Sequence, residues 1–390
     1  MSSRTAGAAM AALVIAAAFP VLGRPAEIPQ EDVKRVVDRA IVPVMARYDV
    51  PGIAIGVLVG GDSYEFDYGV ASRETGAPVT PATLFELGSV SKTLTATLAA
   101  YAQVSGRLDL SDKVATYLPA FRGTKFGDVR LLDLATHTSG GMPLQVPEGI
   151  ENDDQLMKYL QAWQPAHPPG TYRTYANPSI GMLGVIAAKS MDEDFTVLME
   201  RRLFPALGMN RTYIDIPKAR SASYAQGYTA RGAPIRMAEA VLSAEAYGVK
   251  STAGDMIRFL EANMGRRALE AKLQRAIAQT HTGYFEVGRM TQDLVWEQYA
   301  YPVELEALLE GNSGAVSLAA LPVREITPPQ PPRTDVLINK TGSTNGFAAY
   351  IAFVPGRQVG VVILANRNYP IEARVRAAYR MIVELGRHPG

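Results

Sequence analysis

The stretch FELGSVSKTLTATLAAYAQV, residues Phe85–Val104, contains a serine and a lysine three positions apart where a helix is expected to begin. Its second part predicts a helix over Ser91–Val104. Side chains three positions apart share one face of a helix, so Ser89 and Lys92 are expected to be neighbours. A desolvated lysine can take the proton of a serine hydroxyl and turn that serine into a nucleophile.

This pair alone does not identify a catalytic site. A Ser-x-x-Lys pattern arises by chance roughly once in a chain of this length at average composition. Ser89 or Ser91 could cap the helix while Lys92 faces solvent. In the catalytic alternative, the backbone N–H of Ser89 at the helix start could supply half of an oxyanion hole. Other segments have to decide between the two interpretations.

A second candidate motif is Tyr175-Ala176-Asn177, in the segment RTYANPSIGMLG before a predicted helix over Ser179–Ser190. A phenol close to two lysines has a lowered pKa and can relay a proton. The Asn177 amide can both donate to and accept from a substrate amide. The structural alternative is that Asn177 caps the helix and Tyr175 packs beneath it.

The third candidate motif, Lys340-Thr341-Gly342-Ser343, ends the apolar segment VLINKTGS. Lys340 and Thr341 could bind a carboxylate, and the N–H of Ser343 could complete the oxyanion hole. Gly342 would let a ligand approach the backbone closely. The alternative is a turn at a strand end with an exposed lysine.

The predicted elements place strands near both ends of the chain and helices between them. This order predicts a sheet assembled from distant segments with a helical insertion beside it, and a small-molecule site in the cleft between the two. Residues Ile326–Pro332, ITPPQPP, are expected to form a stiff connector. The expected strands are 53–59, 64–70, 335–340, 346–354 and 359–365, and the expected helices are 31–48, 91–104, 153–163, 179–190, 195–207 and 372–385.

Composition excludes several classes of function. The 390 residues carry a formal net charge of +1, which gives no electrostatic reason to expect nucleic acid or an anionic membrane as a partner. The chain has no cysteine, so a thiol nucleophile is ruled out. Its four histidines form no H-x-H or H-E-x-x-H pattern, and the G-x-S-x-G elbow of many Ser-His-Asp hydrolases is absent from the sequence.

Residues 1–26 are expected to be a signal peptide. Arg4 gives a positive start, and the apolar segment Ala6–Ala18 is too short to span a membrane comfortably. Small residues near Gly23 and Ala26 suit cleavage. An uncleaved anchor is the alternative, and export is the expectation that follows from cleavage.

The three motifs together resemble the penicillin-recognising serine enzymes, in which Ser-x-x-Lys, Tyr-x-Asn and Lys-Thr-Gly occur in this order. From about Glu31 to the C-terminus, the chain is similar to class C β-lactamases. The stretches that carry this likeness are FELGSVSKTLTATLAAYA, GGMPLQVP, YANPSIGMLG, LSAEAYGVK, MTQDLVWEQY, NKTGSTNGF and AFVPGR with VILANRNYP.

The resemblance implies an α/β (α+β) fold with an antiparallel sheet built from N- and C-terminal segments and flanked by helices. It implies a sheet domain of residues 27–86 and 225–390, a mainly helical domain of residues 87–224, and an active site in the cleft between them. It further implies that the protein is a periplasmic monomer that hydrolyses cephalosporins and penicillins. Its expected partner is a β-lactam substrate. Neither nucleic acid nor, once the signal is cleaved, a membrane is expected as a partner. No metal or organic cofactor is implied.

Residue roles also follow from the resemblance. Ser89 would attack the lactam carbonyl, and either Lys92 or Tyr175 would be the resting base, because coupled groups titrate jointly. Tyr175 would pass a proton to the lactam nitrogen and later activate the hydrolytic water. The remaining implied site residues are Gln145, Asn177 and Tyr247 for the acylamino side chain, Ser343 with Ser89 for the oxyanion, Gly342 beside the bound substrate, and Lys340, Thr341, Asn368 and Arg374 around the substrate carboxylate.

Six positions depart from the usual class C pattern. His137 is expected to be a packed or loop residue and not a catalyst, since no acidic orienting residue adjoins it in a recognisable motif. These departures affect the expected antibiotic preference and not the expected reaction. They are His137 in place of Tyr, Val146 in place of Phe, Asp293 and Val295 in place of two glycines, Ala348 in place of Gly, and Ile371 in place of Asn.

Rival functions are a D-Ala-D-Ala carboxypeptidase, a serine esterase of the same fold, and a non-catalytic exported binding protein. The intact Lys340-Thr341-Gly342 speaks against the esterase, and the many class C stretches speak against the peptidase. Retention of Ser89 and Lys92 speaks against the binding protein. Class A β-lactamases fit less well, because an acidic residue in an E-x-x-L-N setting has no convincing counterpart.

Overall fold

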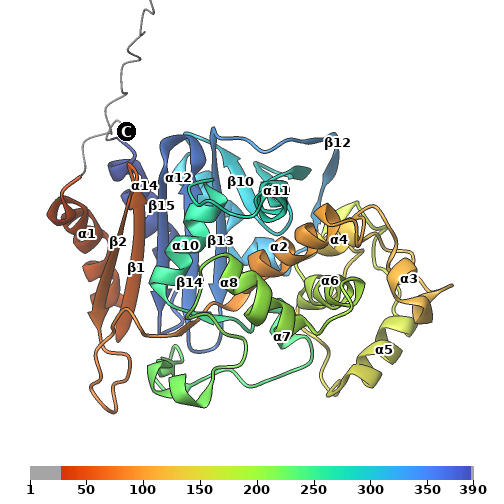
Figure 1. Ribbon diagram of the computed structural model, residues 1–390, viewed down its shortest axis with the longest axis horizontal. Coiled ribbons are helices and arrows are strands. Elements are labelled where there is room, and N and C mark those ends of the chain that lie inside the picture. Colours follow the sequence, from red (N-terminus) through yellow and green to blue (C-terminus); the bar gives the residue numbers. More distant parts are fainter. Residues whose placement is uncertain (1–27, 388–390) are drawn as a thin grey trace, which may run out of the picture.

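A nine-stranded antiparallel sheet forms the centre of the computed structural model, which describes residues 28–387 (Figure 1). The predicted signal peptide, residues 1–26, therefore lies outside the described residues. Across 28–387, none of the helices combines the length and the apolar character that crossing a membrane requires. In sheet order, the strands are β12 (Arg324–Gln330), β8 (Gly283–Val287), β9 (Met290–Gln292), β10 (Glu297–Ala300), β13 (Val336–Ser343), β14 (Ala348–Val354), β15 (Val359–Ala365), β1 (Gly52–Val59) and β2 (Asp62–Gly69).

The sheet joins the two ends of the chain, as the sequence predicted. Strand β1 pairs with β2 on one side and with β15 on the other, with Ile55 facing Ile363. Every residue of β1 is buried, because helices cover both faces of the sheet there. In Figure 1 the orange β1 lies beside the blue β15, and α1 (Gln30–Tyr48) packs near α14 (Ile371–Leu385). A continuous apolar strand such as GIAIGVLV suits this doubly covered position.

Two hydrophobic cores lie on opposite faces of the sheet. The core under α1 and α14 contains Val37, Ile363 and Val375. The larger core joins the other face of the sheet to the helices around α2 (Ser91–Val104), which is buried at nearly every position. Because that core contains residues of both predicted domains, the division at residues 87 and 224 stays a prediction. The helices that pack around α2 are α6 (Asn177–Ser190), α9 (Ser243–Ala246) and α11 (Ala271–Thr280).

Most predicted helices are confirmed, and α2 begins and ends at the predicted residues. The helix predicted over 195–207 is divided into α7 (Phe195–Leu198), a π-helical turn over Met199–Leu203 and α8 (Phe204–Ala206). The other elements of the described chain are α3 (Val114–Tyr117), α4 (Leu131–Ala135), α5 (Asp153–Ala162), α10 (Ala253–Asn263), α12 (Leu305–Gly311), α13 (Gly314–Leu318), β3 (Phe85–Glu86), β4 (Tyr172–Arg173), β5 (Gly227–Tyr228), β6 (Pro234–Ile235), β7 (Lys250–Ser251), β11 (Leu321–Pro322), and 3-10 turns over Gly88–Val90, Pro119–Phe121, Lys218–Ser223 and Pro355–Arg357.

The connector predicted at Ile326–Pro332 is wrong. Residues up to Gln330 belong to β12, which pairs with β8 at the edge of the sheet. Proline lacks an N–H donor, and an edge strand needs donors on one side only, so this proline-rich segment can be a strand. The strand predicted to end at Lys340 also continues, because β13 runs through Thr341 and Gly342 to Ser343. The motif is therefore part of the sheet and not a turn.

Candidate active site

Ser89 lies in the 3-10 turn Gly88–Val90, directly before α2. Lys92, in the first turn of α2, donates from Nζ to Ser89 Oγ at 2.9 Å and to the carbonyl of Ala246 at 2.9 Å. Lys92 is fully buried, and this burial, aided by the charge of Lys340, lowers the pKa of its ammonium to about 8. The predicted serine–lysine pair is thus present, and the lysine can lose its proton at a pH close to neutral.

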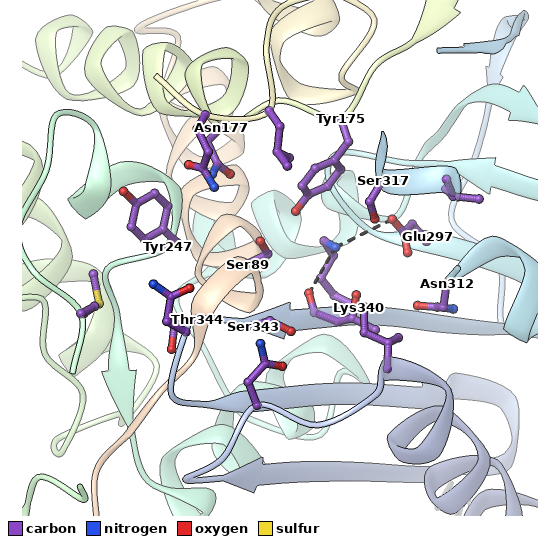
Figure 2. A pocket seen from close by; sticks show the side chains of 18 of the residues that line it. Ser89, Tyr175, Asn177, Tyr247, Glu297, Asn312, Ser317, Lys340, Ser343 and Thr344 are labelled. Atoms are coloured by element: carbon purple, nitrogen blue, oxygen red, sulfur yellow. Dashed lines mark hydrogen bonds and ion pairs between the residues drawn. The ribbon is translucent and has the colours of Figure 1, made fainter. Parts of the chain in front are cut away.

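Tyr175 lies close to the ammonium groups of both lysines. Lys92 Nζ and Lys340 Nζ lie 5.3 and 5.1 Å from the centre of its ring. Burial alone would raise the pKa of the phenol, but the charges of Lys340 and Lys92 outweigh burial and lower this pKa to about 8. The hydroxyl has no hydrogen-bond partner among the described residues, and Figure 2 shows it directed toward Ser89 and Lys340. A phenol in this setting can accept and return a proton.

A buried carboxylate adjoins Lys340 on the side away from Ser89. Glu297 Oε1 accepts from Arg173 Nη2 at 2.9 Å and lies 3.8 Å from Lys340 Nζ. Gln292 Oε1 accepts from Arg173 Nε at 2.6 Å, so two residues of the β9–β10 hairpin hold the guanidinium. The carboxylate keeps Lys340 in place, while Arg173 offsets the negative charge next to Tyr175.

The backbone of β13 approaches the turn that carries Ser89. A Cβ placed on Gly342 would lie 2.0 Å from the carbonyl oxygen of Leu87 and 3.1 Å from the backbone nitrogen of Ser89. A Cβ on Gly88, which has φ +52°, would lie 2.6 Å from the backbone nitrogen of Ser343. Both glycines are therefore required by the close approach, which brings the backbone around Ser343 to the nucleophile.

A cavity of about 570 Å³ opens in front of Ser89 and is also lined by Tyr175 and Lys340. In Figure 2, Asn177, Tyr247 and Thr344 lie on one side of Ser89, and Glu297, Asn312 and Ser317 lie on the other. The cavity has the size and the mixture of polar and apolar groups typical of a small-molecule site.

The side of the cavity near Tyr247 contains the residues predicted to bind an acylamino group. Asn177 donates from Nδ2 to Gln145 Oε1 at 2.7 Å, and its own oxygen has no partner among the described residues. Asn177 is the first residue of α6 and does not cap it, since Ala176 precedes the helix as its N-cap residue. The cap interpretation of Asn177 is therefore wrong. Its oxygen is buried and keeps an unused acceptor capacity at the cavity wall.

Of the residues predicted around the substrate carboxylate, Lys340, Thr341 and Asn368 line the cavity, whereas Arg374 does not. Arg374 is fully buried and donates to the carbonyls of Gly342, Ala349 and Tyr369 and to the hydroxyl of Ser343. Its guanidinium is used within the protein, so its contact with the site is through Ser343. Gly342 likewise contributes through its backbone.

Two departures from the class C pattern have a visible structural setting: His137 packs against Tyr175, and Val295 lies in the turn between β9 and β10. His137 is buried, as expected, with its ring 4.3 Å from that of Tyr175 and its Nδ1 accepting from the N–H of Ala176. Burial and the charges of Arg173 and the two lysines hold its pKa well below the usual range, so His137 is neutral. Val295 has φ +69°, which is strained for a β-branched residue and explains why glycine is usual there.

Sequence reasoning missed Glu297, Arg173, Asn312 and Ser317 as residues at or next to the site. Glu297 lies within the stretch MTQDLVWEQY, but a lone glutamate gives no signal of its own. The ion pair with Arg173 joins positions 124 residues apart, and neither position carries a motif. Asn312 lines the cavity directly after α12, and Ser317 lines it from α13. These helices have seven and five residues, which is too short for a clear helical period.

Comparisons with known proteins agree with this geometry. The family model described as Beta-lactamase matches residues 37–385. A beta-lactamase of Pseudomonas fluorescens is 49% identical over 351 residues, which cover 90% of this chain and 98% of the relative.

Solved structures give the same result. A D-alanine carboxypeptidase AmpC from Burkholderia cenocepacia is 54% identical, with a TM-score of 0.88 and coverage of 91% of this chain and 99% of that one. A class C beta-lactamase in complex with cefoxitin is 47% identical, with a TM-score of 0.89 and coverage of 92% and 100%. The predicted fold class is confirmed by these likenesses. This chain therefore belongs to the beta-lactamase family, and its class C likeness, first indicated by the motifs, extends over the whole fold.

Proposed function

We propose that this chain is a class C serine β-lactamase that hydrolyses the lactam amide of cephalosporins and penicillins through an acyl-Ser89 intermediate. The observation that carries the proposal is the hydrogen bond of 2.9 Å between Lys92 Nζ and Ser89 Oγ, in a cavity lined by Tyr175 and Lys340. Nucleophile, base and cation occur together where a substrate can reach the serine.

In the acylation step, Ser89 Oγ forms a bond to the lactam carbonyl carbon. Its proton passes to the coupled pair of Lys92 and Tyr175, whose pKa values both lie at about 8. The backbone N–H groups of Ser89 and Ser343 stabilise the oxyanion. When the carbon–nitrogen bond breaks, Tyr175 gives a proton to the leaving nitrogen.

In the deacylation step, water attacks the acyl ester and Tyr175 takes a proton from that water. The bond between the acyl carbon and Ser89 Oγ breaks, and Ser89 regains its proton. Tyr175 can act in both steps because the lysine charges keep the pKa of its phenol close to the working pH. This pKa allows the proton to move in either direction at little cost.

Substrate orientation in this proposal follows from the two sides of the cavity. The amides of Asn177 and Gln145 hold the acylamino group, and Tyr247 forms one wall of that side. Lys340 and Thr341 bind the carboxylate on the lactam-fused ring, with Asn368 beside them. Arg374 supports this arrangement from behind by its hydrogen bond to Ser343.

The test is turnover of a chromogenic cephalosporin by the purified protein and by Ser89→Ala. The expected result is rapid hydrolysis by the parent, no turnover by the variant, and a transient covalent mass increase on Ser89. Equal turnover by both proteins would overturn the mechanism. Stoichiometric labelling of the parent without turnover would identify a penicillin-binding protein instead.

A second candidate function is D-alanine carboxypeptidase activity. It is favoured by the likeness to the D-alanine carboxypeptidase AmpC from Burkholderia cenocepacia, to which the chain is 54% identical. The same serine, lysine and tyrosine could form an acyl-enzyme with a peptide ending in D-Ala-D-Ala. Measurement of D-alanine release from such a peptide, beside cephalosporin hydrolysis, ranks the two activities. We expect the lactam to be the better substrate.

The proposal includes export, with cleavage of residues 1–26 and a periplasmic monomer as the mature enzyme. It is supported by the charged start and short apolar segment of that sequence. Mass determination of the protein from a periplasmic extract tests cleavage, and light scattering tests the monomer.

A further inference from the structure

One cationic side chain of the cavity wall has no part in the mechanism above. Arg236 lines the cavity together with its neighbours Ile235 and Met237. Its side chain is exposed to the cleft, unlike the buried Lys340 and Glu297, which are the other charged residues of the described cavity lining. A substrate can therefore meet the charge of Arg236 without any rearrangement.

Arg236 lies on the Tyr247 and Thr344 side of the cavity. Strand β6, which ends at Ile235, pairs with β5. Ile235 packs closely on Gly346, since a Cβ placed on this glycine would lie 2.8 Å from Ile235 Cγ2. The segment that carries Arg236 is thus packed against the turn after β13, where Thr344 lies. Figure 2 shows Thr344 and Tyr247 on the side of Ser89 opposite to Glu297. This is the side proposed to receive the acylamino substituent.

The guanidinium of Arg236 is held in one place. It stacks over the ring of Tyr224 at 4.3 Å from the centroid, and it donates from Nε to the carbonyl of Ala225 at 3.0 Å and from Nη2 to the carbonyl of Tyr224. The ring of Tyr224 is stacked in turn on Phe347, and its hydroxyl donates to Glu86. A guanidinium fixed in this way loses little rotational freedom when it binds a ligand.

Glu86, the buried carboxylate behind Tyr224, is not paired with Arg236. It accepts instead from the Tyr224 hydroxyl and from the N–H of Met237. Among residues 28–387, no carboxylate forms an ion pair with Arg236, and its Nη1 has no hydrogen-bond partner. Both hydrogen bonds that it does make go to backbone carbonyls. The side chain of Arg236 is therefore a fixed cation whose Nη1 can still donate hydrogen bonds. A carboxylate is well suited to bind such a guanidinium.

We propose that Arg236 is a specificity-determining residue that favours β-lactams whose acylamino side chain carries a carboxylate. This inference rests on the proposed function and adds a substrate class to it. The carboxylate at the tip of the substituent pairs with Nη1 of Arg236, while the lactam-fused ring carboxylate is bound at Lys340. β-Lactams with a neutral acylamino side chain form no such ion pair, so Arg236 does not increase their affinity.

The test compares two cephalosporins that differ only in the acylamino side chain, one with a carboxylate and the other with the corresponding carboxamide. For the parent, kcat/KM for the carboxylate form is expected to exceed that for the carboxamide. In Arg236→Gln, this preference is expected to fall about two- to fivefold, mainly through KM, because an exposed ion pair contributes little binding energy. The preference of the parent is also expected to weaken as salt is raised.

Arg231→Gln is the matched control, because Arg231 lies in the loop between β5 and β6, shortly before Arg236 in the chain, is exposed, and does not line the cavity. It should leave the preference unchanged. A melting temperature and a circular-dichroism spectrum like those of the parent show that Arg236→Gln is folded. Equal preference in the parent and Arg236→Gln overturns the inference, whereas failure of the parent to hydrolyse either cephalosporin overturns the proposed function itself.

Discussion

Lys340 Nζ lies 3.8 Å from the same oxygen of Glu297 that accepts a hydrogen bond from Arg173. All three side chains are almost completely buried. The single negative charge of Glu297 is thus divided between two cations, and Lys340 keeps an excess of positive charge. This excess acts on Tyr175, whose pKa is lowered by Lys340 and raised by Glu297.

Arg173→Gln is expected to raise the pKa of Tyr175 above its value of about 8. Without Arg173 the carboxylate of Glu297 turns to Lys340 and offsets the charge that lowers this pKa. A phenol with a higher pKa loses its proton at higher pH, so the rising limb of kcat/KM against pH should shift to higher pH. A pH–rate profile with a cephalosporin substrate measures the shift.

The double variant Arg173→Gln/Glu297→Gln separates this electrostatic role from a structural one. With both charges gone, the rising limb should return toward that of the parent. A double variant whose profile matches the Arg173→Gln profile would contradict the electrostatic account. The single variant should also be less stable by about 3–5 kcal/mol, because it leaves a buried carboxylate without its main partner, and denaturant unfolding measures that loss.

Lys92→Gln is expected to lower kcat by about 10²–10⁴-fold, the usual range for loss of a positioned acid–base group. Glutamine retains a donor toward Ser89 Oγ but cannot take its proton. Stopped-flow hydrolysis of a chromogenic cephalosporin measures the loss. Lys113→Gln, which removes an exposed lysine paired with Asp128, is the control and should retain parental kcat. A Lys92→Gln enzyme within about threefold of the parent would rule out a role in proton transfer.

Gly342→Ala is expected to lower kcat/KM at least about tenfold and to cost about 1–3 kcal/mol of stability. The added methyl group would lie 2.0 Å from the carbonyl oxygen of Leu87, so β13 has to move away from the turn of Ser89. Steady-state kinetics and thermal unfolding measure the two effects. Gly314→Ala is a suitable control, since its Cβ would meet no atom within 4 Å. Parental kinetics in Gly342→Ala would show that the close approach is not needed.

Glu65→Gln is expected to raise the melting temperature at pH 8 but not at pH 4. Burial and the nearby charge of Asp67 raise the pKa of Glu65 to about 7. A carboxyl with a raised pKa in the folded state contributes stability that is present below its unfolded pKa and lost as pH rises through 7. The glutamine avoids this loss, which we expect to give about 1–2 °C at pH 8. Calorimetry of Glu65→Gln and of the exposed Glu74→Gln, at both pH values, checks the expectation.

The sequence predicted those features that depend on local pattern. Helix α2 was predicted to the residue because its apolar run is long and Ser-Lys marks its start. Ser89, Lys92, Tyr175 and Lys340 were predicted to meet because three motifs occurred in one order, and the structure brings them together.

Features that depend on distant partners were not predictable. Strand β12 was missed since its prolines indicate a connector, and only the free edge of the sheet permits them to form a strand. Arg374 was expected in the cleft. Its guanidinium is instead buried and donates to three backbone carbonyls and one serine hydroxyl, which hold it inside the protein. Arg236 carries no motif, and only its stacking on Tyr224 reveals that its charge is fixed.

The pairing of Ile53 in β1 with Ala365 in β15 also limits how early in synthesis the active site can assemble. Translation proceeds from the N-terminus, so the β1–β2 hairpin emerges long before its neighbour on the other side exists. A lone hairpin is marginally stable, and its pairing with a distant strand must wait for loop closure. A nascent chain that still lacks its last segment has an open sheet edge and no KTG strand beside the nucleophile. The active site consequently forms late, after β13, β14 and β15 have been synthesised and have joined β1 in the sheet.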